Sequence, residues 1–457
     1  MSLPPLKPVP VRAADAAWLR MEEPTNPMTI TGVMSFGTRV EAEDLAALLE
    51  ERLLPFDRFR MRVENHESRN ARWVPSPHVD IWNHLIPTEI PAPGGKKGLE
   101  RLVSDLMSEP LSFEHSPWTF HLVQDVDDEI ATAFVARLHH VIGDGIGLMH
   151  VLLSMCDERF DPEKLPGGAL APKRRPKRPA RQRLAQTLRG AAAETRDLLT
   201  RPRHLAQRLK VIGGGIGSLG GLLAMSRDSE TVFKGAASPR KQAAWTRAID
   251  LDLIKKIGHA TGSKVNDVLL AAATGAIRRY LISQGERIGG VDFRVVVPVN
   301  VRPMERAHEM GNAFSLVFLE LPVGVADPIE RLRQLKAGMD ALKDSQQPAV
   351  VYGILNTIGV APDWGHQFVL NLFATKSSAV VTNVPGPTTE LHWGGAPIRE
   401  LMFWVPQAGD VGLGLSILSY AGSVRVGVAA DHAYAPDPVP IVDAFEQEFA
   451  ELAAQYA

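Results

Sequence analysis

The chain has 457 residues, 45% of them hydrophobic and 22% charged, which is the composition of a globular protein large enough for two or three domains. The formal net charge of −2 gives no reason to expect a nucleic-acid partner. With a single cysteine, Cys156, an intrachain disulfide and a CxxC metal site are excluded, and a reduced cytosolic compartment fits. We expect no signal peptide, and no segment reaches the roughly 20 apolar residues of a membrane span.

Strand and helix patterns alternate in the first 160 residues. Residues 29–36 and 131–138 are apolar runs of strand length, and residues 41–54 carry leucines at helical spacing. We therefore predict a first α/β unit over residues 1–160. It has strands at 29–36, 120–123 and 131–138, and helices at 41–54, 99–107 and 145–155.

Residues 161–241 differ from the rest of the chain in composition. Between Lys173 and Lys210 there are thirteen basic and two acidic residues, a local net charge of +11. Leucines recur there at roughly helical spacing, and a basic amphipathic helix favours an anionic membrane surface. A solvated crossover between two domains explains the same composition, and the two interpretations are compatible.

From residue 242 the alternation of strands and helices resumes. Residues 266–283 form the strongest helical pattern, with Asn or Asp expected as its N-cap. A second α/β unit is therefore predicted over residues 242–457. Its strands are expected at 243–249, 293–299, 313–321, 379–382, 413–418 and 424–430, and its helices at 251–260, 266–283, 328–343 and 439–456.

The residues best suited to chemistry are His139 and His140, where an apolar strand ends in a glycine-containing turn. A histidine titrates near neutral pH and can accept and return a proton. Neighbouring histidines point in different directions, so they rarely bind one metal ion, and the chain contains no HExxH motif. A buried histidine satisfied by backbone groups is the alternative, but the nearby Asp144 and Gly145 weaken it. We expect no metal here.

The chain lacks convincing sequence motifs for a serine nucleophile or a dinucleotide-binding site. Ser218 lacks the first glycine of GxSxG, and the GxGxxG match at 215–220 follows a basic helix instead of a strand. What remains is a general base without a protein nucleophile, for which His140 is the candidate because it is closer to the turn. Asp144 is expected to structure the loop by pairing with Arg302, which follows the predicted strand FRVVVPVN.

The segment 139–145, HHVIGDG, resembles the HHxxxDG motif of the CoA-dependent acyltransferase superfamily. Two further segments resemble the ND and NVPGP motifs of bacterial wax ester synthase/diacylglycerol acyltransferases, namely 265–270 and 383–387. Residues 23–28 and 419–438 are similar to the opening and closing blocks of that family. The chain departs from the family at Ser116-Pro117-Trp118, where members carry PLW, and at Thr29, where they usually carry His.

The resemblance implies an α/β fold (an α+β sandwich) of two chloramphenicol-acetyltransferase-like halves with an active-site tunnel between them. It implies transfer of a long-chain acyl group from acyl-CoA, a substrate, to a diacylglycerol or a fatty alcohol, without a cofactor. His140 would be the general base, supported by His139, Asp144 and Gly145, and Asn266 would orient the reacting carbonyl or oxyanion. The residues expected to bind substrate or to support the site are Asp267, Arg302, Asn383, Pro385, Gly386, Pro117 and Trp118.

Plainer interpretations of these motifs remain open. NVPGP is expected mainly to form a tight turn, and Asn266 could be only a helix cap. The apolar residues after His140 are expected to pack in the core rather than to contact an acyl chain: Ile142, Ile146, Leu148 and Met149.

The rival functions are a related acyltransferase that uses a carrier-protein thioester or another lipid alcohol, and a noncatalytic lipid-binding protein on the same scaffold. We expect a cytoplasmic protein associated peripherally with the inner face of the membrane or with lipid bodies. The oligomeric state stays open.

Overall fold

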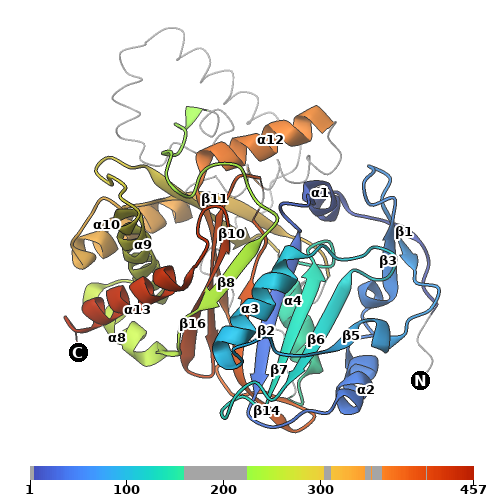
Figure 1. Cartoon of the computed structure of the whole chain (residues 1–457). Coiled ribbons are helices and arrows are strands. Elements are labelled where there is room, and N and C mark those ends of the chain that lie inside the picture. Colours follow the sequence, from blue (N-terminus) through green and yellow to red (C-terminus); the bar gives the residue numbers. More distant parts are fainter. Residues whose placement is uncertain are drawn as a thin grey trace, which may run out of the picture.

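The computed structural model describes residues 5–158, 224–302, 310–344, 351, 363–407 and 409–456. Two large β-sheets stand side by side, each with helices packed against it (Figure 1). The predicted α/β fold of two halves is confirmed. The basic segment 173–210, Ser218 and the GxGxxG match at 215–220 lie outside the described residues.

The sheet of the N-terminal half has six strands in the order β13-β14-β2-β7-β6-β5. Its central antiparallel pair, β2 and β7, places Thr29 opposite His139. The prediction of a strand at 29–36 is confirmed to the residue. The strands are β2 (Thr29–Phe36), β5 (Leu85–Thr88), β6 (Trp118–Gln124), β7 (Thr132–His139), β13 (His392–Trp393) and β14 (Ala396–Trp404).

Helices and a small sheet complete the N-terminal half. The helix predicted at 145–155 is α4 (Gly145–Met155), and α2 (Ala42–Arg52) and α3 (Gly95–Ser108) also match their predictions. Further elements that the sequence did not predict are α1 (Ala13–Met21), β1 (Val9–Pro10), β3 (Met61–Glu64), β4 (Arg72–Pro75) and the short 3₁₀ helices η1 (Asp57–Arg60) and η2 (Ile81–Asn83).

The sheet of the C-terminal half has the order β11-β10-β12-β15-β16-β8, and β9 pairs with β16. The strand expected at 243–249 is two strands, β8 and β9, because the chain leaves the sheet between them. The strands are β8 (Lys241–Trp245), β9 (Ile249–Asp250), β10 (Phe293–Asn300), β11 (Phe314–Leu321), β12 (Ala379–Pro385), β15 (Leu413–Tyr420) and β16 (Ser423–Asp431).

The core of this half surrounds α9, which is buried on nearly all sides. Apolar residues fill its length without a polar stripe, as expected for a helix enclosed by other elements. It packs between α10 and α13, beside the sheet (Figure 1). The helices are α8 (Leu251–Thr261), α9 (Val265–Ser283), α10 (Pro328–Asp344), α12 (Asp363–Lys376), which was not predicted, and α13 (Val439–Ala453).

The two halves interlock through β14. This strand lies late in the sequence, yet it pairs antiparallel with β2 of the N-terminal sheet, so the sheets do not follow a simple division of the chain. On its other side β14 packs closely on β16, where a Cβ on Gly427 would lie 2.6 Å from the Trp404 Nε1 atom. A glycine at this position therefore allows the two sheets to approach each other.

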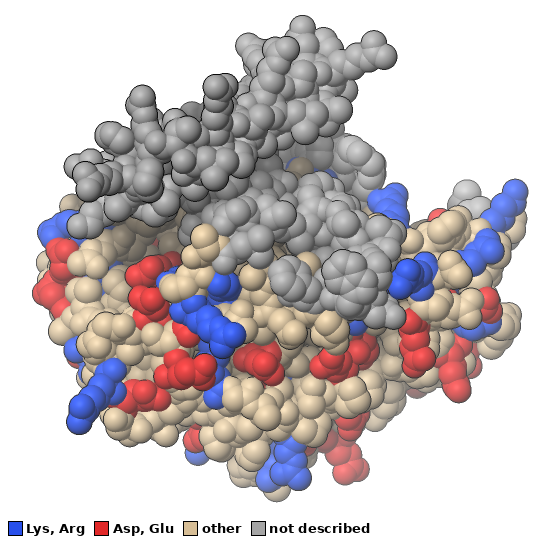
Figure 2. All heavy atoms as spheres, turned by 90° about the horizontal axis from the view of Figure 1, so that it is seen from above, with Lys and Arg blue, Asp and Glu red and all other residues tan. Residues whose placement is uncertain are grey.

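The expected membrane association concerns the charge of the surface and the apolar character of the helices. Figure 2 shows acidic and basic side chains interspersed over the described part of the face seen from above. Among the helices of the described residues, none combines the length and apolar character needed to cross a bilayer. The predicted basic surface at 173–210 thus stays a prediction.

Candidate active site

The histidine pair sits where β7 meets α4, between the two halves. His139 is the last residue of β7, and the backbone N–H of His140 donates to the Met28 carbonyl at 2.8 Å. Asp144 caps α4, since its Oδ1 accepts from the Gly147 N–H at 2.9 Å. The chain therefore turns from strand to helix within five residues, directly at the contact with the C-terminal half.

A cavity of about 260 Å³ opens beside His140 and is lined by both halves. Its walls come mainly from α4, α12, β10 and β12 and are largely apolar. Of the predicted site residues, the structure brings six together on this cavity: His140, Asp144, Gly145, Asn266, Asn383 and Pro385. The cavity lies between the two halves, where the family resemblance implies a tunnel.

The His140 ring is held in a low-polarity setting. The Trp18 ring stacks on it with a centroid separation of 3.7 Å and an interplanar angle of 5°. Burial is the main reason why the pKa of His140 falls from its usual 6.5 to about 3, and the neighbouring His139 lowers it as well. The imidazole is consequently neutral at physiological pH, which is the form that can accept a proton.

His139 has a different position from its neighbour. It is fully buried and does not line the cavity. Its Nδ1 accepts from the Val141 N–H at 3.0 Å, and its Nε2 faces the Glu22 Oε2 at 3.2 Å. Because Nδ1 accepts, Nε2 carries the proton and donates to the carboxylate. Glu22 also accepts from the Met28 N–H at 2.5 Å, and the Met28 carbonyl accepts from the His140 N–H. Through Glu22, His139 therefore helps to fix the residue that binds the His140 backbone.

Asp144 joins the two halves. Its Oδ2 accepts from the Arg302 Nη2 and from the Ala313 N–H, both at 2.8 Å. The predicted Asp144–Arg302 pair is confirmed, and both side chains are buried. Arg302 also donates to the Gly311 carbonyl, and Gly311 forms an isolated β-bridge with Gly143. The loop that carries His140 is therefore bound to the segment that precedes β11.

The two residues of the ND motif have different surroundings. Asn266 is not the helix cap, since α9 begins at Val265 with Lys264 before it. Asp267 instead accepts from the Lys264 N–H at 2.8 Å and does not line the cavity. The Asn266 Oδ1 accepts from the Asn383 Nδ2, which leaves the Asn266 amide nitrogen available on the cavity wall.

The NVPGP segment is not a tight turn, contrary to expectation. Asn383, Val384 and Pro385 are the last residues of β12 and pair in parallel with β15, and the strand pairing overrides the turn preference of the prolines. Gly386 follows the strand, where its N–H donates to the Ser419 carbonyl at 3.0 Å. A Cβ on Gly386 would lie 2.3 Å from that oxygen, so only glycine fits there.

Pro117 and Trp118 support the site without lining the cavity. The Pro117 carbonyl accepts from the His139 N–H at 3.0 Å. The Trp118 ring is buried, stacks on His84 and donates from Nε1 to the Phe59 carbonyl at 3.1 Å. The variant form of the PLW block therefore lies in the core beside β7 and not on the cavity wall.

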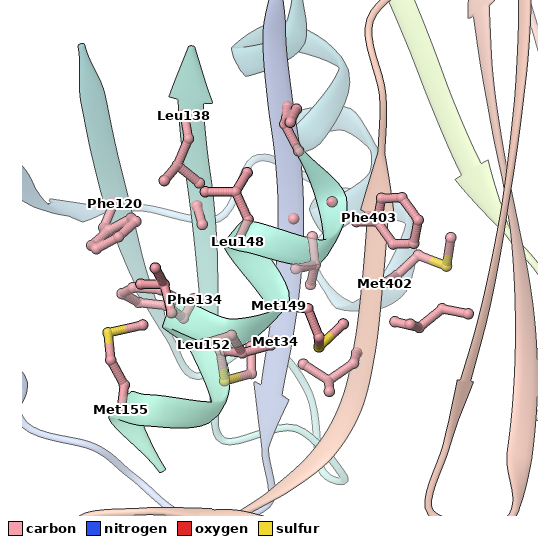
Figure 3. A pocket seen from close by; sticks show the side chains of 18 of the residues that line it. Met34, Phe120, Phe134, Leu138, Leu148, Met149, Leu152, Met155, Met402 and Phe403 are labelled. Atoms are coloured by element: carbon pink, nitrogen blue, oxygen red, sulfur yellow. The ribbon is translucent and has the colours of Figure 1, made fainter. Parts of the chain in front are cut away.

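A second cavity of about 130 Å³ lies under α4 and is lined mainly by the N-terminal half. Its lining is almost entirely apolar, and Figure 3 shows Leu148, Met149, Leu152 and Met155 of α4 along its length. It shares four residues with the first cavity, so the two spaces adjoin at the start of α4: Gly145, Met149, Val384 and Phe403. Leu148, Met149 and Ile146 thus line a cavity and do not only pack in the core, contrary to expectation. Ile142 is a core residue, as expected.

The sequence did not reveal three residues around His140, namely Trp18, Asn312 and Phe314. Trp18 lies on α1, a nine-residue helix with short apolar residues whose weak periodicity gave little signal. Asn312 and Phe314 come from the C-terminal half and reach His140 only through the fold. Among the described residues, no three His, Cys, Asp or Glu side chains are grouped as ligands for a metal ion.

Family models match most of the chain. The wax ester synthase/diacylglycerol acyltransferase (WS/DGAT) catalytic domain matches residues 11–269, and the WS/DGAT C-terminal domain matches residues 310–453. The chain belongs to the WS/DGAT family of acyltransferases. The HHxxxDG segment, α4 and the start of α9 all lie within the matched catalytic domain.

Individual WS/DGAT relatives agree with this assignment over nearly the full length. The chain is 24% identical to the probable diacylglycerol O-acyltransferase tgs1 of Mycobacterium tuberculosis, covering 96% of this chain and 95% of that one. It is also 24% identical to wax ester synthase/diacylglycerol acyltransferase 7 of Arabidopsis thaliana, covering 95% and 97%.

Solved structures show the same fold. The WS/DGAT from Marinobacter aquaeolei VT8 superposes with a TM-score of 0.70 at 21% identity, covering 98% of this chain and 99% of that one. The first condensation domain of the calcium-dependent antibiotic synthetase superposes with a TM-score of 0.60 at 14% identity, covering 99% and 97%.

The Asp144–Arg302 pair gives a first testable prediction. Removing one partner from a buried ion pair typically costs about 3–5 kcal/mol, because the other charge stays buried without compensation. We expect Asp144→Ala and Arg302→Ala each to lower the apparent Tm and the activity, and the double variant to lose much less than the sum. Thermal denaturation of the four proteins in a double-mutant cycle measures this. Strictly additive losses would show that the pair is not coupled.

Proposed function

We propose that this WS/DGAT acyltransferase moves a long-chain acyl group from acyl-CoA to the hydroxyl of a diacylglycerol or a long-chain alcohol, with His140 as general base. The observation that carries the proposal is a neutral, buried imidazole on an apolar cavity between the two halves. The names of the relatives, which include diacylglycerol O-acyltransferases and a wax ester synthase, support the acceptor classes.

The reaction proceeds without a covalent acyl-enzyme. The acceptor hydroxyl gives its proton to Nε2 of His140 while its oxygen forms a bond to the thioester carbonyl carbon. The tetrahedral intermediate then breaks its C–S bond, and the leaving CoA thiolate takes the proton back from His140. Holding both substrates in one cavity lowers the barrier by proximity. Because a thioester is already an activated acyl donor, the reaction requires neither a metal nor a prosthetic group.

Asn266 stabilises the oxyanion in this proposal. Its Oδ1 is engaged by Asn383, so its Nδ2 is the group that can donate into the cavity. A donor already aimed at developing negative charge is commonly worth about 3–4 kcal/mol. The two asparagines of the ND and NVPGP motifs would therefore act together, since Asn383 sets the orientation in which Asn266 donates.

We further propose that the protein works at a lipid surface, in the cytoplasm at the inner face of the membrane or on lipid bodies. Its acceptors partition into lipid, and residues 173–210 carry a net charge of +11 that would favour anionic headgroups. A carrier-protein thioester as donor is the alternative within the same chemistry. A noncatalytic lipid-binding role is disfavoured by the intact base and its supporting contacts.

His140→Ala tests the proposed function directly. We expect the variant to lose at least about 100-fold in turnover, the usual contribution of a general base, while its Tm stays close to that of the wild type. The assay follows one labelled acyl-CoA with a panel of diacylglycerols and fatty alcohols, separated by chromatography into triacylglycerol and wax ester. The control is His259→Ala, which removes an exposed histidine on α8. Near wild-type turnover of His140→Ala would contradict the proposal.

The cavity under α4 is proposed to hold an alkyl chain of a substrate. It is apolar and adjoins the His140 cavity at Gly145, so a chain bound at the reaction centre can extend into it. Leu152→Trp would fill this space, and we expect it to shift the chain-length preference towards shorter substrates. Ser154→Trp, on the exposed side of the same helix, is the matched control. An unchanged chain-length profile of Leu152→Trp would exclude the cavity as a chain site.

A further inference from the structure

The segment that precedes β11 belongs to the C-terminal half and contacts the loop that carries His140. Gly311 bridges to Gly143, and the Ala313 N–H donates to Asp144. Between them, the Asn312 Nδ2 donates to the backbone carbonyl of His140 at 2.9 Å. Asn312 therefore lies against the proposed base, although it does not line the cavity.

The orientation of the Asn312 amide is set by a buried carboxylate. Asp15 on α1 is fully buried, and its Oδ1 accepts from both the Asn312 N–H at 2.8 Å and the Asn312 Nδ2 at 2.9 Å. Its Oδ2 accepts from the Arg58 Nη2 at 2.7 Å. A carboxylate only accepts hydrogen bonds, so the Nδ2 group must face Asp15. Both Nδ2 hydrogens are thus used, and Oδ1 is left as an acceptor.

Two buried polar atoms at this place lack an ordinary partner. Among the described residues, neither the His140 Nδ1 nor the Asn312 Oδ1 meets a partner at standard hydrogen-bond geometry. Leaving a donor and an acceptor buried and unpaired is costly, which favours their pairing with each other. Two contacts favour the protonated His140 ring and so raise its pKa against the larger opposing effect of burial: first the backbone carbonyl of His140 itself, and then the Asn312 side chain.

The rings around His140 limit how it can turn. Trp18 stacks flat on one side, and Phe314 lies at a centroid distance of 5.9 Å and an angle of 44°. Nδ1 is buried while the ring lines the cavity, so the Nε2 edge is the one that meets substrate. On the His139 ring, by contrast, Nδ1 accepts a hydrogen bond and Nε2 donates one.

We propose that Asn312 is a positioning residue for His140. Its Oδ1 accepts the Nδ1 proton, which keeps Nε2 unprotonated and directed at the acceptor hydroxyl, and Asp15 holds the amide in the orientation that makes this possible. The C-terminal half therefore supplies, through Asn312, a group that orients the general base. This inference rests on the proposed function of His140 as general base.

The protonation of His140 can be observed directly in the full-length protein. Histidine labelled with ¹⁵N gives long-range ¹H–¹⁵N correlations that distinguish the two tautomers, and the His140 signals are those lost in His140→Gln. At neutral pH we expect the wild type to carry its proton on Nδ1 of His140 and none on Nε2. A wild-type His140 with its proton on Nε2 would overturn the inference, whatever any variant does.

Asn312→Ala provides the second part of the test. We expect the His140 tautomer to shift towards Nε2–H and kcat to fall at least about tenfold, with KM nearly unchanged because Asn312 does not line the cavity. Asn26→Ala is the matched control: Asn26 is a buried asparagine that also crosses between the halves, donating to the Gly409 carbonyl at 2.8 Å. It should leave the tautomer unchanged.

The outcomes separate this inference from the proposed function. Loss of activity in His140→Ala together with an unchanged tautomer and kcat in Asn312→Ala would overturn the positioning role alone. Retained activity in His140→Ala would overturn the general-base function as well. If Asn312→Ala does not fold, a wild-type His140 that carries its proton on Nε2 would still overturn the inference.

Discussion

The active site depends on one buried contact between the two halves of the chain. Asp144 follows His139 and His140 in the N-terminal half, and its carboxylate binds Arg302 and the Ala313 N–H of the C-terminal half. A buried carboxylate needs such partners to remain in the interior. The loop that carries His140 is therefore held by contacts with the C-terminal half, and β14, inserted in the N-terminal sheet, joins the two halves further.

The two histidines differ in their surroundings, which fits a structural role for His139 and the proposed catalytic role for His140. His139 is satisfied on both ring nitrogens by Val141 and Glu22 and anchors the end of β7. His140 has its pKa lowered to about 3 by burial, and its ring faces an apolar space. A histidine with this pKa stays neutral over the physiological range. It is a weak base towards water, so its proton transfer depends on a hydroxyl placed directly against it and on stabilisation of the intermediate.

Hydrophobic patterns and motifs predicted the elements that residues close together in the sequence determine. The strand at 29–36, the helix at 145–155 and the Asp144–Arg302 pair were predicted correctly, because strong hydrophobic patterns and the HHxxxDG motif mark them. The β14 strand, and Trp18 and Asn312 beside His140, were missed, because pairing and contact across the halves define them. NVPGP was interpreted as a turn because of its prolines, whereas pairing with β15 extends β12 through Pro385.

Direct transfer within a ternary complex is the central claim, and the release of CoA tests it most directly. The wild-type enzyme would be mixed with labelled acyl-CoA in a rapid-quench instrument, with and without a long-chain alcohol, and both free thiol and protein mass would be measured. Direct transfer predicts that CoA is released only when the alcohol is present, and that the protein mass never changes. A burst of CoA without alcohol, accompanied by a protein heavier by one acyl group, would contradict it.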